Sequence, residues 1–142
     1  IPKPYHLYKG KPLLLHSIDK AKKYAKFSKI VLVINKKHKA HIKKLKIKDV
    51  QIVIGGKTRA ESAYKGLNNI KSDNIKNVMI HDAARPNFSI NLLDKLNKKL
   101  KIYDCIIPAI QTSDSIKEKI AFKLSNLSRV KFSSIVILSS AY

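Results

Sequence analysis

Short apolar runs that alternate with helical patterns constrain the fold of this chain more than any other feature. The runs cover residues 29–35, 50–54, 77–81 and 103–110, and each is largely apolar. Such runs are typical of strands that are covered on both faces of a sheet. Apolar residues at helical spacing follow Pro12 and recur in residues 38–45, 58–70 and 89–100. Together they predict an α/β fold with a doubly wound, mostly parallel sheet.

The third apolar run ends in the motif His81-Asp82-Ala83-Ala84-Arg85-Pro86. In an open α/β sheet, ligands bind at the carboxyl ends of the strands. The Asp82 carboxylate is suited to a divalent metal or a hydroxyl, and the Arg85 guanidinium can grip a phosphate with its fork. An ordinary salt bridge that caps the next helix is the structural alternative.

A pair of glycines, Gly55 and Gly56, follows the second apolar run and precedes a predicted helix. Glycines allow close backbone approach, and the start of the helix would direct its free amide groups at a bound anion. Ser62, one turn into this helix, would lie within reach of a base or a sugar. The alternative is a glycine pair that merely ends a strand.

Two weaker signals lie at either end of the chain. Lys3 stands between Pro2 and Pro4, which predict an extended backbone that holds the ammonium group in place. Ser115 lies in a polar segment after the fourth apolar run. Alone, the first would be a solvated lysine and the second a turn.

The strong positive charge restricts the expected partners. The chain has 30 Lys and Arg residues against 9 Asp and Glu, for a formal net charge of +21 at pH 7. Arginine stands only at positions 59, 85 and 129, and Trp is absent. Proteins that read bases rely on arginine forks, and single-strand binders interleave aromatic residues with basic ones. We expect no specific nucleic-acid partner, but a basic module that binds polyanions loosely remains an alternative.

Size, apolar runs and cysteine content limit the number of domains, the contact with membranes and the cellular compartment that we expect. Its 142 residues suffice for about one domain. No apolar run approaches the roughly 20 residues that span a bilayer, so we expect no membrane partner. Cys105 is the single cysteine, which excludes an internal disulfide and favours a reducing cytoplasm.

Taken in order, the motifs resemble the 2-C-methyl-D-erythritol 4-phosphate cytidylyltransferases. The matching pieces are residues 2–5, 10–13, 16–18, 55–62, 81–86 and 114–117. Ribitol-phosphate cytidylyltransferases look similar, but they typically have Asp-Ser-Val-Arg-Pro where this chain has Asp-Ala-Ala-Arg-Pro. The resemblance implies a Rossmann-like nucleotidyltransferase fold and the transfer of a cytidylyl group from CTP to a sugar-alcohol phosphate, assisted by Mg²⁺.

The resemblance also assigns roles to individual residues. The CTP-binding positions are Gly55, Gly56, Lys57, Ser62 and Ala83, the last as a ribose contact. The positions for the sugar-alcohol phosphate are Asp82, Arg85 and Ser115, and the catalytic ones are Lys3 and Arg129. The arginine would reach into a neighbouring subunit, which implies a homodimer. Lys57 stands where the family often has an acidic or small residue.

The resemblance extends from residue 2 to about residue 129, and we expect a partial cytidylyltransferase domain over residues 1–129. The family's glycine-rich loop and first strand precede the matched part, so the fold would be incomplete at both ends and the chain by itself weakly active or inactive. Residues 130–142 are expected to form an atypical tail, truncated or frame-shifted. A second enzyme domain fused downstream stays an open alternative.

Overall fold

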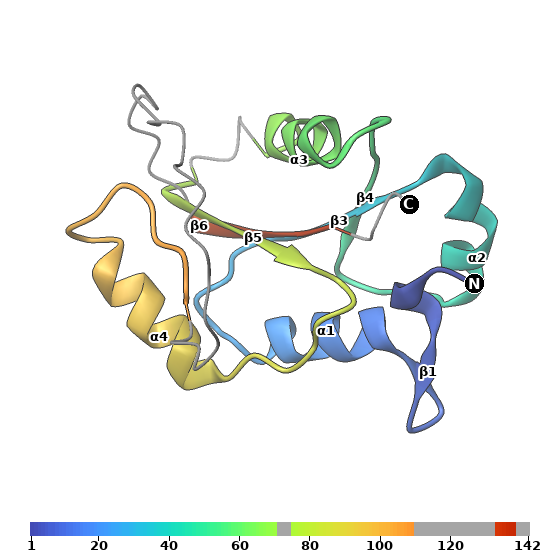
Figure 1. Ribbon diagram of the computed structural model, residues 1–142, viewed down its shortest axis with the longest axis horizontal. Coiled ribbons are helices and arrows are strands. Elements are labelled where there is room, and N and C mark those ends of the chain that lie inside the picture. The colour runs from blue at the N-terminus through green and yellow to red at the C-terminus, as the bar shows by residue number, and fades with distance from the viewer. Residues whose placement is uncertain (71–74, 110–132, 139–142) are drawn as a thin grey trace, which may run out of the picture.

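A computed structural model describes residues 1–70, 75–109 and 133–138. Its main sheet has four strands in the order β4-β3-β6-β5, and all of them run parallel. The strands are β3 (Ile30–Ile34), β4 (Gln51–Ile54), β5 (Asn77–Asp82) and β6 (Ser133–Leu138). The longer helices are α1 (Leu13–Lys22), α3 (Arg59–Asn68) and α4 (Ile90–Lys99). Figure 1 shows α3 on one face of the sheet and α1 and α4 on the other, which confirms the predicted doubly wound α/β class.

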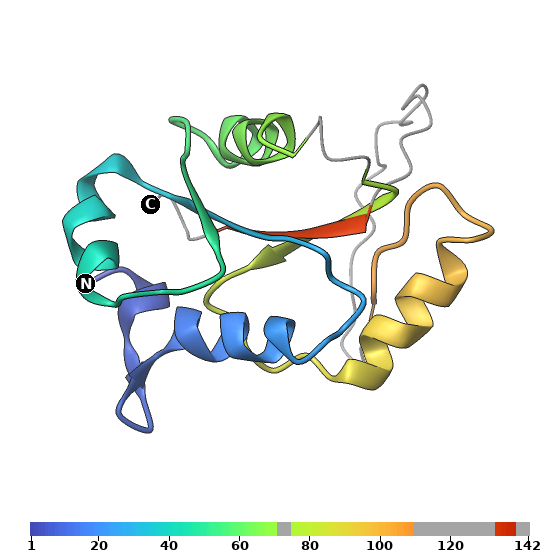
Figure 2. The same cartoon turned by 180° about the vertical axis from the view of Figure 1, so that it is seen from behind.

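The core has two layers because strand side chains alternate between the faces of the sheet. In β3 all five residues are buried. Ile30, Leu32 and Ile34 join the cluster that includes residues of α1 and α4. Val31 and Val33 join a smaller cluster on the α3 side. Figure 2, seen from behind, shows the same division, so the continuous apolar run in β3 is explained by helices on both faces.

Short elements surround this framework. They are the 3-10 turns η1 (Lys3–Tyr5) and η2 (Lys36–His38), the strands β1 (Leu7–Tyr8) and β2 (Lys11–Pro12), and the helix α2 (Lys39–Lys44). The strands β1 and β2 form an antiparallel hairpin. Its turn has positive φ angles of 49° at Lys9 and 72° at Gly10. Within the described residues, no helix has both the length and the apolar character needed to cross a membrane.

The strand predicted over residues 103–110 is wrong for residues 103–109, which form no strand, and residue 110 lies outside the described part. Ile102 and Ile107 are 79% and 81% exposed, respectively. An apolar run becomes a strand only where a sheet edge and a covering face accept it, and neither requirement is visible in local sequence.

The apolar part of the tail has a defined place. The backbone of β6 pairs with β3 on one side and with β5 on the other. Figure 1 shows this strand between its two neighbours in the middle of the sheet. Part of the segment expected as an atypical tail over residues 130–142 is thus a strand of the main sheet. A parallel sheet covered on both faces accepts such a segment because its strands are continuously apolar.

Candidate active site

The carboxyl ends of parallel strands lie at one edge of the sheet, where ligands bind in folds of this kind. Residues 55–58, which we call the glycine loop, follow β4 directly, and residues 82–85, the aspartate loop, begin at the last residue of β5. In Figure 1 the arrowhead of β5 points toward the side of the molecule on which η1 and α2 lie. The structure thus places η1, the glycine loop and the aspartate loop on one side of the fold.

Packing of Tyr5 holds η1 against α2. The Tyr5 side chain is 5% exposed. Its ring lies 5.1 Å from that of His38 and 4.8 Å from that of His41, between centroids. The extended backbone predicted at Lys3 is wrong, since this residue begins the η1 turn and is exposed. A proline in the first turn of a helix needs no N–H donor, which is why the flanking Pro4 does not prevent the turn.

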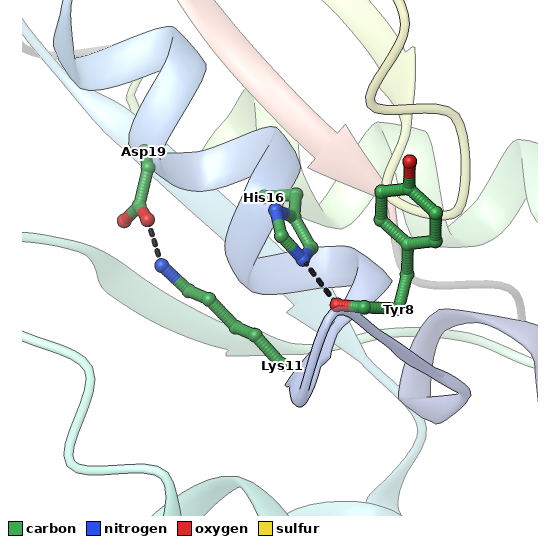
Figure 3. Close-up of polar contacts among 4 residues, drawn as sticks. All are labelled: Tyr8, Lys11, His16 and Asp19. Atoms are coloured by element: carbon green, nitrogen blue, oxygen red, sulfur yellow. Dashed lines mark hydrogen bonds and ion pairs between the residues drawn. The ribbon is translucent and has the colours of Figure 1, made fainter.

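A second set of contacts ties the β1–β2 hairpin to α1, as Figure 3 shows. The His16 ring nitrogen Nε2 lies 2.8 Å from the Tyr8 carbonyl oxygen, and Lys11 forms an ion pair with Asp19. The hairpin directly follows η1 in the chain, so these contacts also restrict where η1 can lie relative to α1.

The two glycines are required by the packing of the loop on α3. A Cβ atom on Gly55 would lie 2.6 Å from the Ser62 Oγ, and one on Gly56 would lie 2.3 Å from the Glu61 Cβ. Neither separation is sterically allowed without a shift of the loop. The close approach predicted from the glycine pair therefore occurs between the loop and its own helix.

Side chains of α3 satisfy the amides of the glycine loop. The Gly56 N–H donates to the Ser62 Oγ over 3.0 Å, and the Lys57 N–H donates to the Glu61 carboxylate over 2.7 Å. Thr58 caps the helix by accepting from the Glu61 N–H. These three amides, of which only that of Glu61 belongs to α3, are therefore not free for an anion. Ser62 is 4% exposed and supports the loop from beneath.

The aspartate loop is a compact turn. One Asp82 carboxylate oxygen accepts from the Ala84 N–H over 3.0 Å, and the Asp82 carbonyl accepts from the Arg85 N–H over 3.1 Å. The other carboxylate oxygen lies 3.5 Å from the Arg85 Nε, and the Arg85 side chain is 77% exposed. The pair predicted as a structural alternative therefore exists, but it does not cap α4. That helix is capped by Ser89, whose Oγ accepts from the Leu92 N–H.

His81 is a partly buried histidine beside the aspartate loop. Burial lowers its pKa, and the neighbouring charges of Asp82 and Arg85 raise and lower it, respectively. Its ring packs edge-on against Phe88 with the centroids 4.7 Å apart. The buried Nδ1 finds no hydrogen-bond partner among the residues that the structure describes. These features favour a neutral imidazole at neutral pH.

The other predicted site residues divide into those that the structure describes and those that it does not. Ala83 is fully buried, whereas Lys57 is exposed in the glycine loop. Ser115 and Arg129 lie outside the described residues. Ser17 was not predicted, yet its buried hydroxyl donates to the Ala83 carbonyl oxygen over 2.8 Å. A serine on the apolar face of a predicted helix was the signal that could have drawn attention to it.

Comparison with known proteins identifies the family. A family model described as 2-C-methyl-D-erythritol 4-phosphate cytidylyltransferase matches residues 1–124. A bifunctional enzyme IspD/IspF of Pelagibacter ubique is 67% identical over 128 residues, which are 90% of this chain and 34% of that relative. A 2-C-methyl-D-erythritol 4-phosphate cytidylyltransferase of Haemophilus influenzae is 42% identical over 119 residues, or 82% of this chain and 51% of that relative.

The fold comparison agrees with the sequence comparison. The crystal structure of 4-diphosphocytidyl-2C-methyl-D-erythritol synthase from Anaerococcus prevotii matches with a TM-score of 0.71 and 25% identity, over 90% of this chain and 56% of that one. The chain spans about a third of the length of the bifunctional relatives that it matches. Because the family model covers most of its residues, the chain belongs to the 2-C-methyl-D-erythritol 4-phosphate cytidylyltransferase family.

Proposed function

We propose that this protein transfers a cytidylyl group from CTP to 2-C-methyl-D-erythritol 4-phosphate, a step in the synthesis of isoprenoid precursors. The products would be 4-diphosphocytidyl-2-C-methyl-D-erythritol and pyrophosphate. The observation that carries the proposal is the match of the family model over residues 1–124, which include both loops at the carboxyl edge of the sheet.

In the proposed reaction, a phosphate oxygen of the sugar-alcohol phosphate attacks the α-phosphorus of CTP. A new P–O bond forms there while the bond to the β-phosphate breaks, and pyrophosphate leaves with the electron pair. Such a step depends on positioning and on neutralising charge. We assign the charge on the α-phosphate to Lys3 and the phosphate of the acceptor to Arg85. The hydroxyl groups of the sugar-alcohol phosphate would donate hydrogen bonds to the Asp82 carboxylate.

CTP would lie over the glycine loop. We assign the cytosine to the surface formed by Gly55, Gly56 and Lys57, with Ser62 as the support that fixes its shape. Because Ala83 is fully buried, we assign it an indirect role at the ribose, through the position of the aspartate loop. Because the Gly56 and Lys57 amides already have side-chain partners, the loop would offer carbonyl oxygens and the Lys57 side chain to the nucleotide. From the family resemblance, Ser115 would bind the acceptor, and Arg129 would act across a homodimer.

We propose Mg²⁺ as the divalent cation of the reaction. Within the part of the chain that the structure describes, no group of three His, Cys, Asp or Glu side chains could hold a metal ion. Mg²⁺ commonly uses substrate phosphates and only one or two carboxylates. A site with few protein ligands fits an ion that arrives bound to the CTP phosphates. Among the proposed site residues, Asp82 is the one with a carboxylate that could bind it. When bound, the ion offsets the negative charge of the triphosphate.

The compartment is part of the same proposal. Cys105 is an exposed free cysteine among the described residues. An exposed thiol is compatible with a reducing compartment, and we assign the protein to the cytoplasm.

Pyrophosphate release tests the function directly. The product of the complete gene and the 142-residue chain are each incubated with CTP, Mg²⁺ and either 2-C-methyl-D-erythritol 4-phosphate or ribitol 5-phosphate. We expect the complete gene product to release pyrophosphate with the first acceptor far faster than with the second. A preference for ribitol 5-phosphate would assign the protein to another polyol phosphate. No release with either acceptor, together with DNA binding that weakens steeply with salt, would support a polyanion-binding module instead.

A further inference from the structure

Among the described residues outside β6, Ser17 and Ser62 are the buried polar side chains, at 0% and 4% exposure. A buried hydroxyl is costly unless it forms a hydrogen bond. The Ser62 Oγ accepts from the Gly56 N–H, and the Ser17 Oγ donates to the Ala83 carbonyl oxygen. Each serine therefore joins a helix to one of the two loops of the candidate site.

We propose that Ser17 is a positioning residue for the acceptor phosphate: its hydroxyl holds the aspartate loop on α1 and so sets where Asp82 and Arg85 stand. This inference rests on the proposed function, in which those two side chains bind the sugar-alcohol phosphate.

Apart from the pairing of Asp82 with Leu138 at the end of β5, the other hydrogen bonds of the aspartate loop among the described residues are local. The Ala84 and Arg85 amides both bond to Asp82 itself. These bonds can persist while the part of the loop beyond β5 shifts. The Ser17 bond differs because it joins residues that are 66 positions apart. It therefore fixes the loop relative to the remainder of the fold. Since Ala83 is 0% exposed, no water can easily replace the hydroxyl.

Helix α1 is a rigid reference for the loop. Leu14, Ile18 and Ala21, on the same face as Ser17, are at most 1% exposed and belong to the main core cluster. A second link between α1 and the segment after the loop comes from the Lys20 ammonium group, which lies 5.5 Å from the centre of the Phe88 ring.

Neighbouring residues of α1 hold different parts of the candidate site. His16 contacts the Tyr8 carbonyl in the hairpin that follows η1, as Figure 3 shows. Ser17, next in sequence, bonds to the aspartate loop on the buried side of the helix. The helix thus links the segment that carries Lys3 to the loop that carries Asp82 and Arg85. A loose Ser17 contact should therefore affect the acceptor, which both Asp82 and Arg85 are proposed to bind, more than the nucleotide, to which only Ala83 of this loop is assigned.

The test measures KM for both substrates in the complete gene product. Ser17→Ala should raise KM for 2-C-methyl-D-erythritol 4-phosphate about tenfold, as expected for the loss of one well-placed hydrogen bond. The KM for CTP should change clearly less, because only Ala83 of this loop is assigned to the nucleotide. Ala21→Gly is the matched control, because it weakens the same buried face of α1 without touching the loop. If Ser17→Ala changes both KM values equally, or neither, the proposal is wrong.

Hydrogen exchange tests the positioning without relying on activity. Ser17→Ala should speed exchange of the Ala84 and Arg85 amides at least tenfold, and Ala21→Gly should not. If Ser17→Ala fails to fold, Ser17→Cys keeps a similar volume with a weaker donor and should show the same pattern to a smaller degree. Unchanged exchange in the serine variants would overturn the proposal. Absence of pyrophosphate release in the unaltered protein would refute the proposed function alone.

Discussion

Replacing Arg85 by lysine separates a role in phosphate binding from a role in folding. The substitution keeps the positive charge and removes the planar fork that grips a phosphate with two hydrogen bonds. Lysine would still offer a point charge to the acceptor. A large effect on turnover, with little effect on stability, would therefore identify the fork as the functional feature.

The structure sets the expected effect on stability. The Arg85 side chain is 77% exposed, and its Nε lies 3.5 Å from the Asp82 carboxylate. An exposed pair at this distance contributes about 0.5 kcal/mol or less to folding. The Arg85 amide hydrogen bond to the Asp82 carbonyl does not involve the side chain. We expect the free energy of unfolding of Arg85→Lys to stay within about 0.5 kcal/mol of the unaltered protein.

The expected effect on the reaction is larger. Loss of bidentate phosphate recognition should lower kcat/KM for the sugar-alcohol phosphate by at least tenfold, which corresponds to about 1.4 kcal/mol. Steady-state kinetics with pyrophosphate detection measure this, and urea unfolding measures stability in the same preparations. Arg85→Ala removes both the charge and the fork, so the difference in kcat/KM between Arg85→Lys and Arg85→Ala measures the contribution of the charge alone. Lys98→Ala, an exposed change on α4 that also removes one charge, is the control and should alter kcat/KM less than twofold.

Two outcomes would refute this reasoning. Unchanged kinetics in Arg85→Lys would mean that the fork is not used. A loss of more than about 1 kcal/mol in the free energy of unfolding, with normal kinetics in the folded fraction, would make Arg85 a structural residue.

Three further predictions concern the same edge of the sheet. Ser62→Ala should weaken CTP binding by about 1 kcal/mol, measured by calorimetry, because the Gly56 amide loses its acceptor. Gly56→Ala should lower the free energy of unfolding by about 1–3 kcal/mol in urea, because the new Cβ would lie 2.3 Å from that of Glu61. Burial lowers the pKa of His81 in the folded protein, so as the pH falls the unfolded chain binds a proton at this residue before the folded protein does. Stability should therefore fall as the pH drops below about 6.5, and less in His81→Gln.

Local sequence predicted those elements whose causes are local. The fully buried strand β3 follows from its continuous apolar run. The starts of α3 and α4 follow from Thr58 and Ser89, each of which accepts a hydrogen bond from an amide three residues later. In each case the interacting groups lie within a few positions of one another, so a short window of sequence contains the physical reason.

Strand pairing was harder to predict because it depends on distant partners. Residues 103–109 and 133–138 are both rich in apolar side chains, yet only the second segment forms a strand in the described structure. The free energy of a strand comes mainly from neighbours and covering helices, which composition does not specify. In the candidate site, too, interactions between residues far apart in sequence could not be predicted. Both loops were found from their residue types, whereas the Ser17 hydrogen bond to Ala83 crosses 66 positions.

The charge of the protein and the geometry of its loops have different consequences for substrate choice. A formal net charge of +21 attracts any polyphosphate, and this long-range field raises the rate of encounter without distinguishing one phosphate ester from another. Discrimination then requires short-range contacts that differ between ligands. In the described structure, the amides of Gly56 and Lys57 are already paired, so side chains and loop shape remain to make those contacts. The buried hydroxyls of Ser17 and Ser62 set that shape. Selectivity among nucleotides should therefore depend on the Ser62 hydrogen bond, and selectivity among acceptors on the Ser17 hydrogen bond, more than on the many surface lysines.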